Sequence, residues 1–488
     1  MNGSVLNKRA LKIEYALPFV FGIILLFVFA FFDQTAENFE IAAEVIVCAL
    51  LVLSGIIVYF LYKTDLLSFK ALIYLVLLCG FALRLGYALK IGYWQNQHDV
   101  ESLNSSGHLS YIYYIYQNNA LPETNDWQFS HPPLHHFIAS LVIRVGDILG
   151  FAVGRSFENI QLLTVLYSSI SMLLGVKICS EIGIKQKELV LCSLILAFFP
   201  GMFILAGSIN NDMLMIMLVL SALLFLIKWY KSPSGKFALL CGLFAGLAMM
   251  TKVSAAIFAV AAAITVIIKF IIDKDLKFSK VLLHAVLFVA LLLPLGLWHP
   301  IRNYLLFEQP LGFVAPIPVN NPLYTGDISI AERFILPFSS EPFDVYVDVW
   351  NEYNVWYYLL RNSLFGEYNF GNPGIAFFAV LANLILIILS LISCVYLLSK
   401  CKSIKEILPV LPFYVIQLLF FIYFNLSYPF GCSMDFRYIV PLFFIGVVFI
   451  GKMFTVLRQN DAVLPNIYKY SAVVSTGILV FSSVVIFI

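Results

Sequence analysis

The sequence predicts an all-α protein that crosses a membrane many times. Of its 488 residues, 61% are hydrophobic and only 12% are charged, and 45 are phenylalanine. Ordinary soluble domains carry about 25% charged residues. The mean hydropathy is +0.92, and the apolar runs approach the roughly 20 residues that a helix needs to cross the hydrocarbon core. A soluble multidomain enzyme is therefore excluded, and the net charge of +2 gives no support for nucleic-acid binding.

Thirteen apolar runs are long enough, or nearly so, to form spanning helices. They cover residues 13–32, 41–62, 69–91, 159–182, 189–206, 212–230, 237–250, 253–272, 280–299, 374–399, 406–427, 438–457 and 470–488. The first run is long for a cleaved signal peptide, so we expect a retained helix. The chain then divides into three N-terminal transmembrane helices (1–91), an outer loop (92–158), a transmembrane core (159–299), a second outer loop (300–373) and C-terminal transmembrane helices (374–488).

Lysine and arginine concentrate on one side of the predicted bundle. Seven segments hold 20 of the 30 basic residues and six acids: 1–12, 63–70, 184–188, 228–236, 269–280, 400–406 and 452–469. Because positively charged loops face the cytoplasm, we expect an integral membrane protein with a cytoplasmic N-terminus. The cysteines form no disulfide framework, which favours a bacterial plasma membrane with the opposite loops facing outside.

One apolar segment cannot be a span. If residues 132–151 crossed the membrane, every later basic loop would face outward. We therefore expect a helix that lies at the outer membrane surface, and a second such helix from about Ser106 to Asn118. The second outer loop, 300–373, is rich in proline, asparagine and aromatic residues, and we expect it to form an ordered cap over a cavity.

Candidate catalytic acids follow the third predicted span. Asp99 and Glu101 lie in the first outer loop, where a carboxylate shielded from water can act as a general base; the alternative is a solvated loop acid. His108, His131 and His135 come after them. Their spacing matches no metal motif, so we predict that they line a substrate cavity and that the protein binds no metal.

Cationic side chains occur at the outer ends of other predicted spans. Lys252, Arg302 and Arg437 together suit a phosphate site, because cations bind phosphate through charge-assisted hydrogen bonds. The alternative is that they anchor helices at the membrane interface. Neighbouring polar residues are expected to line the same substrate cavity: Asn211, Asp212, Asn303 and Tyr438. Asn211 and Asp212, which precede a predicted helix, also suit its N-cap.

Several short motifs carry a family resemblance when they are taken together. They are Asp99, Gly107-His108, Tyr111-Ile112, His131-Pro132-Pro133-Leu134, Asn210-Asn211-Asp212, the segment from Gly246 to Lys252, Arg302-Asn303-Tyr304 and Phe436-Arg437-Tyr438. In this order and spacing they resemble the GT-C superfamily of integral-membrane glycosyltransferases. The most similar branch is that of the protein O-mannosyltransferases and lipid A aminoarabinose transferases. The resemblance covers about residues 92–440.

The resemblance implies a GT-C fold with two juxtamembrane helices in the first outer loop. It also implies an inverting, metal-independent transferase that moves a sugar from a polyprenyl phosphate to an acceptor hydroxyl outside the cytoplasm. Asp99 corresponds to the general base, with Glu101 as the alternative, and the three cations to ligands of the donor phosphate. The implied partners are the lipid-linked donor, with no further cofactor, and a protein, lipid or cell-wall glycan as acceptor. The chain differs from the family in two ways. Three predicted spans, rather than one, precede this loop, and Val100 separates the two acids Asp99 and Glu101, which are often adjacent in the family.

A secondary transporter or flippase for a lipid-linked or small anionic substrate is the alternative function. Transporters carry ionisable groups near the membrane midplane. In this sequence the polar groups collect at the outer ends of the spans and the middle of most spans is bare, which favours the transferase.

Overall fold

The structure is a computed structural model that describes residues 30–31, 39–95, 99–100, 102–335, 353–368, 372–459 and 466–487. Nine of its helices are long and apolar enough to cross a membrane. They are α3 (Phe39–Lys63), α4 (Phe69–Ile91), α7 (Val153–Glu181), α10 (Asp212–Lys231), α12 (Ala256–Ile272), α13 (Phe278–Phe307), α16 (Pro373–Leu398), α19 (Val440–Gln459) and α20 (Asn466–Phe487). Over the described residues the chain is helical except for loops and one isolated β-bridge, Tyr324 to Phe430. The predicted all-α membrane architecture is confirmed.

Four further apolar helices account for the other predicted spans. The bent pair α8 (Gln186–Phe198) and α9 (Pro200–Ala206) forms a tenth span if it is counted as one, and α11 (Gly235–Met249) and α18 (Leu411–Ser427) are shorter. Every predicted run from 41–62 onward thus contains a helix. The run 13–32 lies outside the described residues except for residues 30 and 31, so the total of 13 spans stays a prediction.

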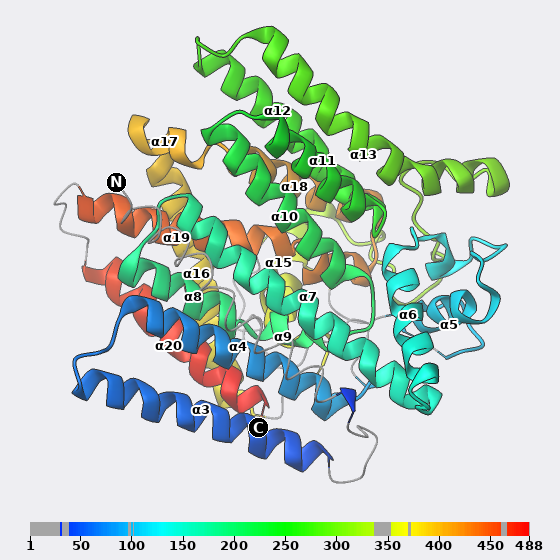
Figure 1. The fold of residues 1–488 in the computed structure, drawn as a ribbon, viewed down its shortest axis with the longest axis horizontal. Coiled ribbons are helices and arrows are strands. Elements are labelled where there is room, and N and C mark those ends of the chain that lie inside the picture. The colour runs from blue at the N-terminus through cyan, green and yellow to red at the C-terminus, as the bar shows by residue number, and fades with distance from the viewer. Residues whose placement is uncertain are drawn as a thin grey trace.

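The remaining elements are short and connect the spans. They are α5 (His108–Asn118), α6 (Leu134–Ile148), α14 (Ile330–Phe334), α15 (Val355–Phe365), α17 (Cys401–Ile407) and the 3-10 turns η1 (Trp127–Ser130), η2 (Val253–Ala255), η4 (Gly431–Met434) and η5 (Phe436–Tyr438). In Figure 1 the spans lie side by side, α11, α12 and α13 stack along the upper side, and α5 and α6 lie together at the right-hand end. We call this end of the molecule the α5/α6 end.

The predicted span 189–206 is broken into two helices. Its two halves, α8 and α9, meet at an angle of 48°. Pro200 stands at the first turn of α9 and has no N–H to donate to the carbonyl group of Leu196. Arg84 of α4 supplies the missing donors: its guanidinium donates to the carbonyl oxygens of Leu196 (3.1 Å) and Ala197 (2.9 Å). This buried arginine is an exception to the expectation that the spans are bare, and it stabilises the break.

Replacing Arg84 by methionine is expected to destabilise the fold by about 2–4 kcal/mol, because two or more buried carbonyl groups lose their donor. Arg84 is fully buried, so water cannot replace it. The matched control is Lys90→Met on the same helix, which removes a half-exposed ion pair with Glu44 and is expected to cost less than about 1 kcal/mol. The unfolding midpoint of both variants in detergent is the measurement. Equal stability of the two variants would contradict the role given to Arg84.

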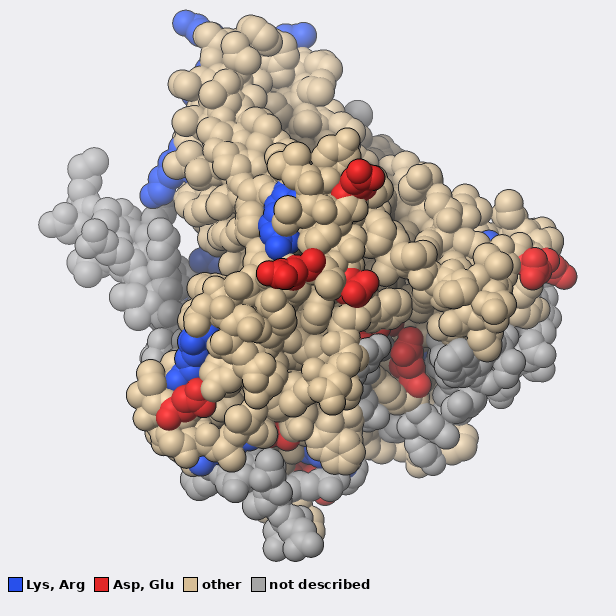
Figure 2. Space-filling model, turned by 90° about the vertical axis from the view of Figure 1, so that its right-hand side faces the viewer, with Lys and Arg blue, Asp and Glu red and all other residues tan. Residues whose placement is uncertain are grey.

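Several of the basic loops predicted to face the cytoplasm are described, and these lie at one end of the bundle and are joined by ion pairs. Lys231 lies 3.8 Å from Glu181, Lys452 lies 2.6 Å from Glu406, and Arg458 lies 3.1 Å from Glu188. The opposite, α5/α6 end faces the viewer in Figure 2, where acidic side chains lie across the face and basic ones mostly toward its margin. The structure therefore groups the charges as the alternation of loops predicts.

Helix α6 does not cross the bundle. At its start, the backbone N–H of Leu134 donates to the carbonyl of Met250, directly after α11 (3.1 Å). Near its end, Gly146 packs against Ser156 at the beginning of α7. Gln161, one turn further along α7, donates to the carbonyl of Gly207 after α9, so both ends of α6 lie at the same end of the molecule. The arrangement agrees with the surface helix predicted from the loop charges, and α5 packs beside it.

The second outer loop differs from the prediction in two ways. Helix α13 continues to Phe307 and so takes the first residues of the expected loop. The loop also contains the buried helix α15, which packs against α9: a Cβ on Gly201 would lie only 2.2 Å from the carbonyl oxygen of Ser363. Only glycine permits this approach. Residues 336–352 of the expected cap lie outside the described residues.

Candidate active site

Five charged side chains from four segments meet at the α5/α6 end. They are Asp99 in the loop after α4, Asp212 at the start of α10, Lys252 between α11 and η2, and Asp435 and Arg437 at η5. We call them the charge cluster. The Arg437 Nη1 atom lies 2.6 Å from Asp99 Oδ2 and 4.0 Å from Asp212 Oδ2. Lys252 Nζ lies 2.5 Å from Asp212 Oδ1. Sequence positions more than 300 residues apart thus form one site.

Local backbone structure explains how Asp212 and Lys252 meet. The N–H of Asp212 donates to Asn210 Oδ1 (3.1 Å), which stabilises the turn before α10. The Asn211 carboxamide donates to the carbonyl of Thr251 (3.0 Å). Asn211 therefore fastens the start of α10 to the turn that carries Lys252, and the two opposite charges come together.

Asp99 is held in an uncommon backbone conformation. Its φ is +56°, a left-handed value that aspartate tolerates better than most residues. Its carbonyl accepts a hydrogen bond from the His108 N–H at the start of α5 (2.9 Å). The Asp99 side chain is 26% exposed, whereas those of Asp212 and Asp435 are 1% and 3% exposed, so Asp99 is the most accessible acid of the cluster. Glu101, the alternative base, lies outside the described residues.

Arg437 stays charged although it is buried. Burial lowers the pKa of its guanidinium, but Asp99 beside it raises the pKa, and the result lies well above the usual value. The backbone N–H of Arg437 donates to Asp435 Oδ1 (2.9 Å), and its Nε lies 3.6 Å from Asp435 Oδ2. Asp435, which the sequence analysis did not select, therefore orients Arg437. Its position two residues before the arginine is typical of a turn cap.

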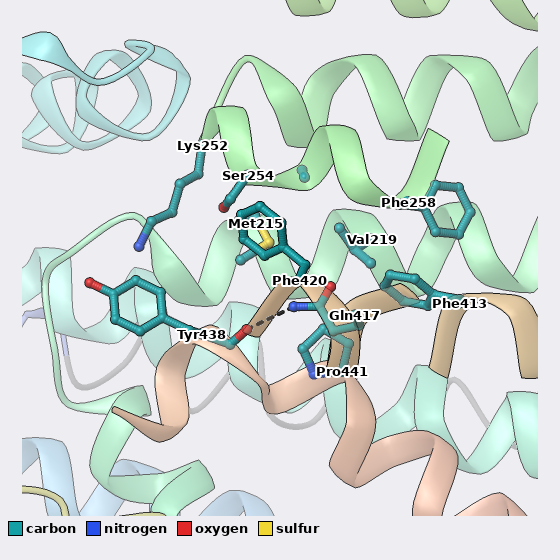
Figure 3. A pocket seen from close by; sticks show the side chains of 11 residues that line it. Met215, Val219, Lys252, Ser254, Phe258, Phe413, Gln417, Phe420, Tyr438 and Pro441 are labelled. Carbon is teal, nitrogen blue, oxygen red and sulfur yellow. Dashed lines mark hydrogen bonds between the residues drawn. The ribbon is translucent and has the colours of Figure 1, made fainter. Parts of the chain in front are cut away.

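An apolar pocket adjoins the charge cluster. Figure 3 shows Lys252 and Tyr438 at one end of it and Phe258 and Phe413 at the other, with Met215 and Val219 between them. Lys252 Nζ lies 5.1 Å from the centre of the Tyr438 ring. The pocket thus combines a cationic end with a largely apolar wall, in which Ser254 and Gln417 are further polar residues, and this combination suits an amphiphilic ligand.

A group of four histidines lies beside the cluster: the three predicted from the sequence, His108, His131 and His135, and in addition His136. His108, His135 and His136 are buried, and His131 is half-buried. His108 Nδ1 and His136 Nε2 are hydrogen-bonded at 2.9 Å, and His135 Nε2 donates to the carbonyl of Ile209 (2.8 Å). Burial lowers the pKa of His131 and of His135 to about 4 in each case, and the pKa values of His108 and His136 are lowered as well. The four rings are therefore neutral at pH 7. In the described part of the chain, no group of three or more His, Cys, Asp or Glu side chains is arranged to hold a metal ion.

The stability of the protein is expected to fall as the pH is lowered from 7 to 5. Unfolded histidine takes up a proton near pH 6.5, whereas folded His131 and His135 do so only near pH 4. Between these values the unfolded state binds more protons, so acid favours unfolding, by about 2 kcal/mol per histidine between pH 7 and pH 5. Thermal unfolding in detergent measures the effect. The double variant His131→Gln/His135→Gln is expected to give a shallower pH dependence, and an unchanged slope would contradict this assignment.

Arg302 and Asn303 lie apart from the charge cluster. Arg302 donates to Asn303 Oδ1 (2.9 Å) and to the carbonyl of Pro122 (2.9 Å), and among the described acids it has no ion-pair partner. Asn303 donates a hydrogen bond of 3.3 Å to the carbonyl of Ser130, the residue before His131. The two residues thus tie the end of α13 to the loop that carries the histidines. The structure does not bring Arg302 to Lys252 and Arg437, and its predicted contact with phosphate stays a prediction.

Comparisons with known proteins agree with the resemblance seen in the sequence. Residues 130–298 match a family model described as dolichyl-phosphate-mannose-protein mannosyltransferase. This match confirms the predicted resemblance to the membrane glycosyltransferases, and it includes His131, His135, His136, Asp212 and Lys252. No curated protein matches the sequence.

Among solved structures, the chain is similar to the protein O-mannosyltransferase Pmt1-Pmt2 complex of S. cerevisiae bound to its sugar donor. The identity is 13% and the TM-score 0.37, over 52% of this chain and 36% of that chain. It is also similar to ArnT from Cupriavidus metallidurans bound to undecaprenyl phosphate, with 12% identity and a TM-score of 0.35 over 78% of this chain and 77% of that one. For the apo state of ArnT, the identity is 12% and the TM-score 0.35, over 75% of this chain and 74% of that one. The chain thus spans little more than a third of the Pmt chain that it matches.

Proposed function

We propose that this protein is a glycosyltransferase that moves a sugar from a polyprenyl phosphate to an acceptor hydroxyl. The observation that carries the proposal is the position of two cations at the polar end of an apolar pocket. Lys252 lines that end, and Arg437, which pairs with Asp99, lies 5.2 Å from the ring of the lining residue Tyr438. The loop charges support a site on the outer side of the membrane and an N-terminus in the cytoplasm, and we propose that the membrane is a bacterial plasma membrane. The family match over residues 130–298 supports the same class of reaction.

The pocket and the cluster suit the two ends of a lipid-linked donor. In the proposed complex the first isoprenoid units lie between Phe258, Phe413 and Met215, and the phosphate lies between Lys252 and Arg437. Both cations are paired with acids in this structure, so the phosphate shares or replaces those acids as partners. The sugar then lies toward the histidine group.

Unsatisfied acceptors favour a ligand with hydroxyl groups. Asn211 Oδ1, Asp212 Oδ2 and His135 Nδ1 are buried and have no hydrogen-bond partner among the described residues. Buried polar atoms are normally paired. The hydroxyls of a sugar are donors that satisfy such acceptors, whereas a purely apolar or purely anionic ligand offers none.

The reaction follows from these positions. Asp99 takes the proton of the acceptor hydroxyl while its oxygen forms a bond with the anomeric carbon. The bond from that carbon to the phosphate oxygen breaks on the opposite side, so the configuration inverts and polyprenyl phosphate leaves with the electron pair. Lys252 and Arg437 stabilise the charge that develops on the leaving phosphate. In this scheme the chain's own side chains act in each step.

Transfer by the purified protein tests the proposal. The protein in lipid nanodiscs is incubated with polyprenyl phosphates that carry labelled hexoses or pentoses, together with an extract of acceptors from the same cells. We expect the label to move into a protein, lipid or glycan. Lipid mass spectrometry of cells that lack the protein should show the accumulated donor. Movement of a lipid-linked sugar across vesicles with no new glycosidic bond would overturn the proposal in favour of a flippase.

A further inference from the structure

The cationic side chain that faces Asp99 stands on a very short element. Turn η5 consists of three residues, Phe436–Tyr438, and carries Arg437. Its own hydrogen bonds are the Asp435 cap and the bonds from Tyr438 and Ile439 back to residues 435 and 436. So short a turn has no helical ladder to fix its direction. Contacts from other elements must therefore set the position of the guanidinium.

Two buried carboxamides from different helices hold the two ends of this turn. The backbone N–H of Phe436 donates to Oδ1 of Asn362 on α15 (2.7 Å). The Nε2 atom of Gln417 on α18 donates to the carbonyl of Tyr438 (2.8 Å), as the dashed line in Figure 3 shows. Asn362 and Gln417 are 2% and 7% exposed, so water does not compete for these bonds. One carboxamide acts as acceptor and the other as donor, and Arg437 lies between them.

Helix α15 is itself firmly seated, which makes it a suitable support. The Asn383 carboxamide of α16 donates to the carbonyl of Leu360 and to Ser363 Oγ (both 2.9 Å), and Gly201 of α9 packs directly on the Ser363 carbonyl. The α15 residues that follow Asn354 are almost all buried. The segment expected to be a cap thus reaches into the core and touches the backbone of the candidate phosphate site.

We propose that Asn362 and Gln417 are positioning residues that set the direction of Arg437 toward Asp99 and the donor phosphate. The proposal rests on the proposed function for the role of the phosphate. Neither carboxamide is charged, so neither forms an ion pair with the cluster. Both side chains bond to the backbone of η5, and Gln417 also lines the pocket. A loss of either bond lets the guanidinium leave the line between Asp99 and Asp212.

Removing either carboxamide is expected to weaken binding of the donor lipid. Asn362→Leu and Gln417→Met keep the side-chain size and remove the hydrogen bond, and each is expected to raise the Kd of undecaprenyl phosphate about tenfold in nanodiscs. In an Arg437→Gln background the same substitutions are expected to add less than about twofold, because the group that they position is gone. Asn425→Leu is the matched control: it is buried on the same face of α18 as Gln417 and bonds only within its own helix. Its Kd should equal that of the wild type.

Hydrogen exchange gives a readout that does not depend on the lipid. The Phe436 amide should exchange at least tenfold faster in Asn362→Leu, with an unchanged unfolding midpoint, and remain protected in Asn425→Leu. Unchanged exchange together with an unchanged Kd would overturn the positioning role. The positioning role would also be overturned if the loss of affinity in each variant were fully additive with the loss in Arg437→Gln, because additivity indicates general damage to the fold. If wild-type protein binds no undecaprenyl phosphate, the proposed function fails, and slow exchange of Phe436 in Asn362→Leu would then reject the positioning role separately.

Discussion

Replacing Asp99 by asparagine is expected to lower the rate of sugar transfer by about 10²–10⁴-fold, the range that a general base contributes. Asparagine keeps the size of the side chain but cannot accept the proton of the acceptor hydroxyl. The loss should appear in kcat at saturating donor. Because Asp99 pairs with Arg437 in this structure, its removal also frees the guanidinium for the donor phosphate, so the Kd of the donor should stay the same or fall. Initial rates and lipid binding by the same preparation measure the two effects.

Two variants separate this prediction from a nonspecific loss of acid. Glu123→Gln changes an exposed acid of the same outer loop and is expected to leave the rate within about twofold, as for most surface substitutions. Glu101→Gln tests the alternative base that the sequence left open. A full loss in Glu101→Gln with normal transfer by Asp99→Asn would reassign the base to Glu101, and full activity in both would contradict a carboxylate base in this loop.

The helices could be predicted because lipid imposes a simple rule on sequence. A span must be apolar for about 20 residues, so runs such as 69–91 and 212–230 mark α4 and α10 almost to the residue. Loop charge predicted the non-crossing helix α6, whose apolarity alone resembles that of a span. The break at Pro200 and the helix α15 were not predicted. Pro200 sits inside an apolar run, and the sequence does not show that Arg84 satisfies the carbonyls freed there. Helix α15 is amphiphilic and only 11 residues long.

The charged residues of the site could be predicted more readily than its amides. Asp99, Asp212, Lys252 and Arg437 stand out because charges at the ends of apolar spans are costly and rare, and the structure brings these four together. Buried amides give no such signal, since the cost of a carboxamide depends on whether a partner lies within hydrogen-bond reach. Asn362 and Gln417 find that partner in η5, which is distant in sequence from one of them. A pattern within one segment cannot reveal such contacts.

Replacing Arg437 by glutamine is expected to lower both donor affinity and transfer rate, by about 10²–10³-fold in kcat/KM. A charge-assisted bond to phosphate contributes about 1.5–3 kcal/mol to binding, and stabilisation of the leaving phosphate adds a loss in the transition state. Arg437→Lys keeps the charge but loses the planar fork and should recover affinity more than rate. The measurements are the Kd of undecaprenyl phosphate and kcat at saturating donor.

The acids around Arg437 make stability the necessary control for this variant. Asp99, Asp212 and Asp435 all lie within 4.0 Å of its guanidinium, and removal of the cation leaves buried negative charge without compensation, which destabilises folded proteins by about 3–5 kcal/mol. The double variant Arg437→Gln/Asp435→Asn removes one acid together with the arginine, and it should recover stability without recovering transfer. If the double variant regained activity along with its unfolding midpoint, Arg437 would be a structural counter-ion for the acids, and the phosphate would have to be bound by Lys252 and residues elsewhere in the pocket.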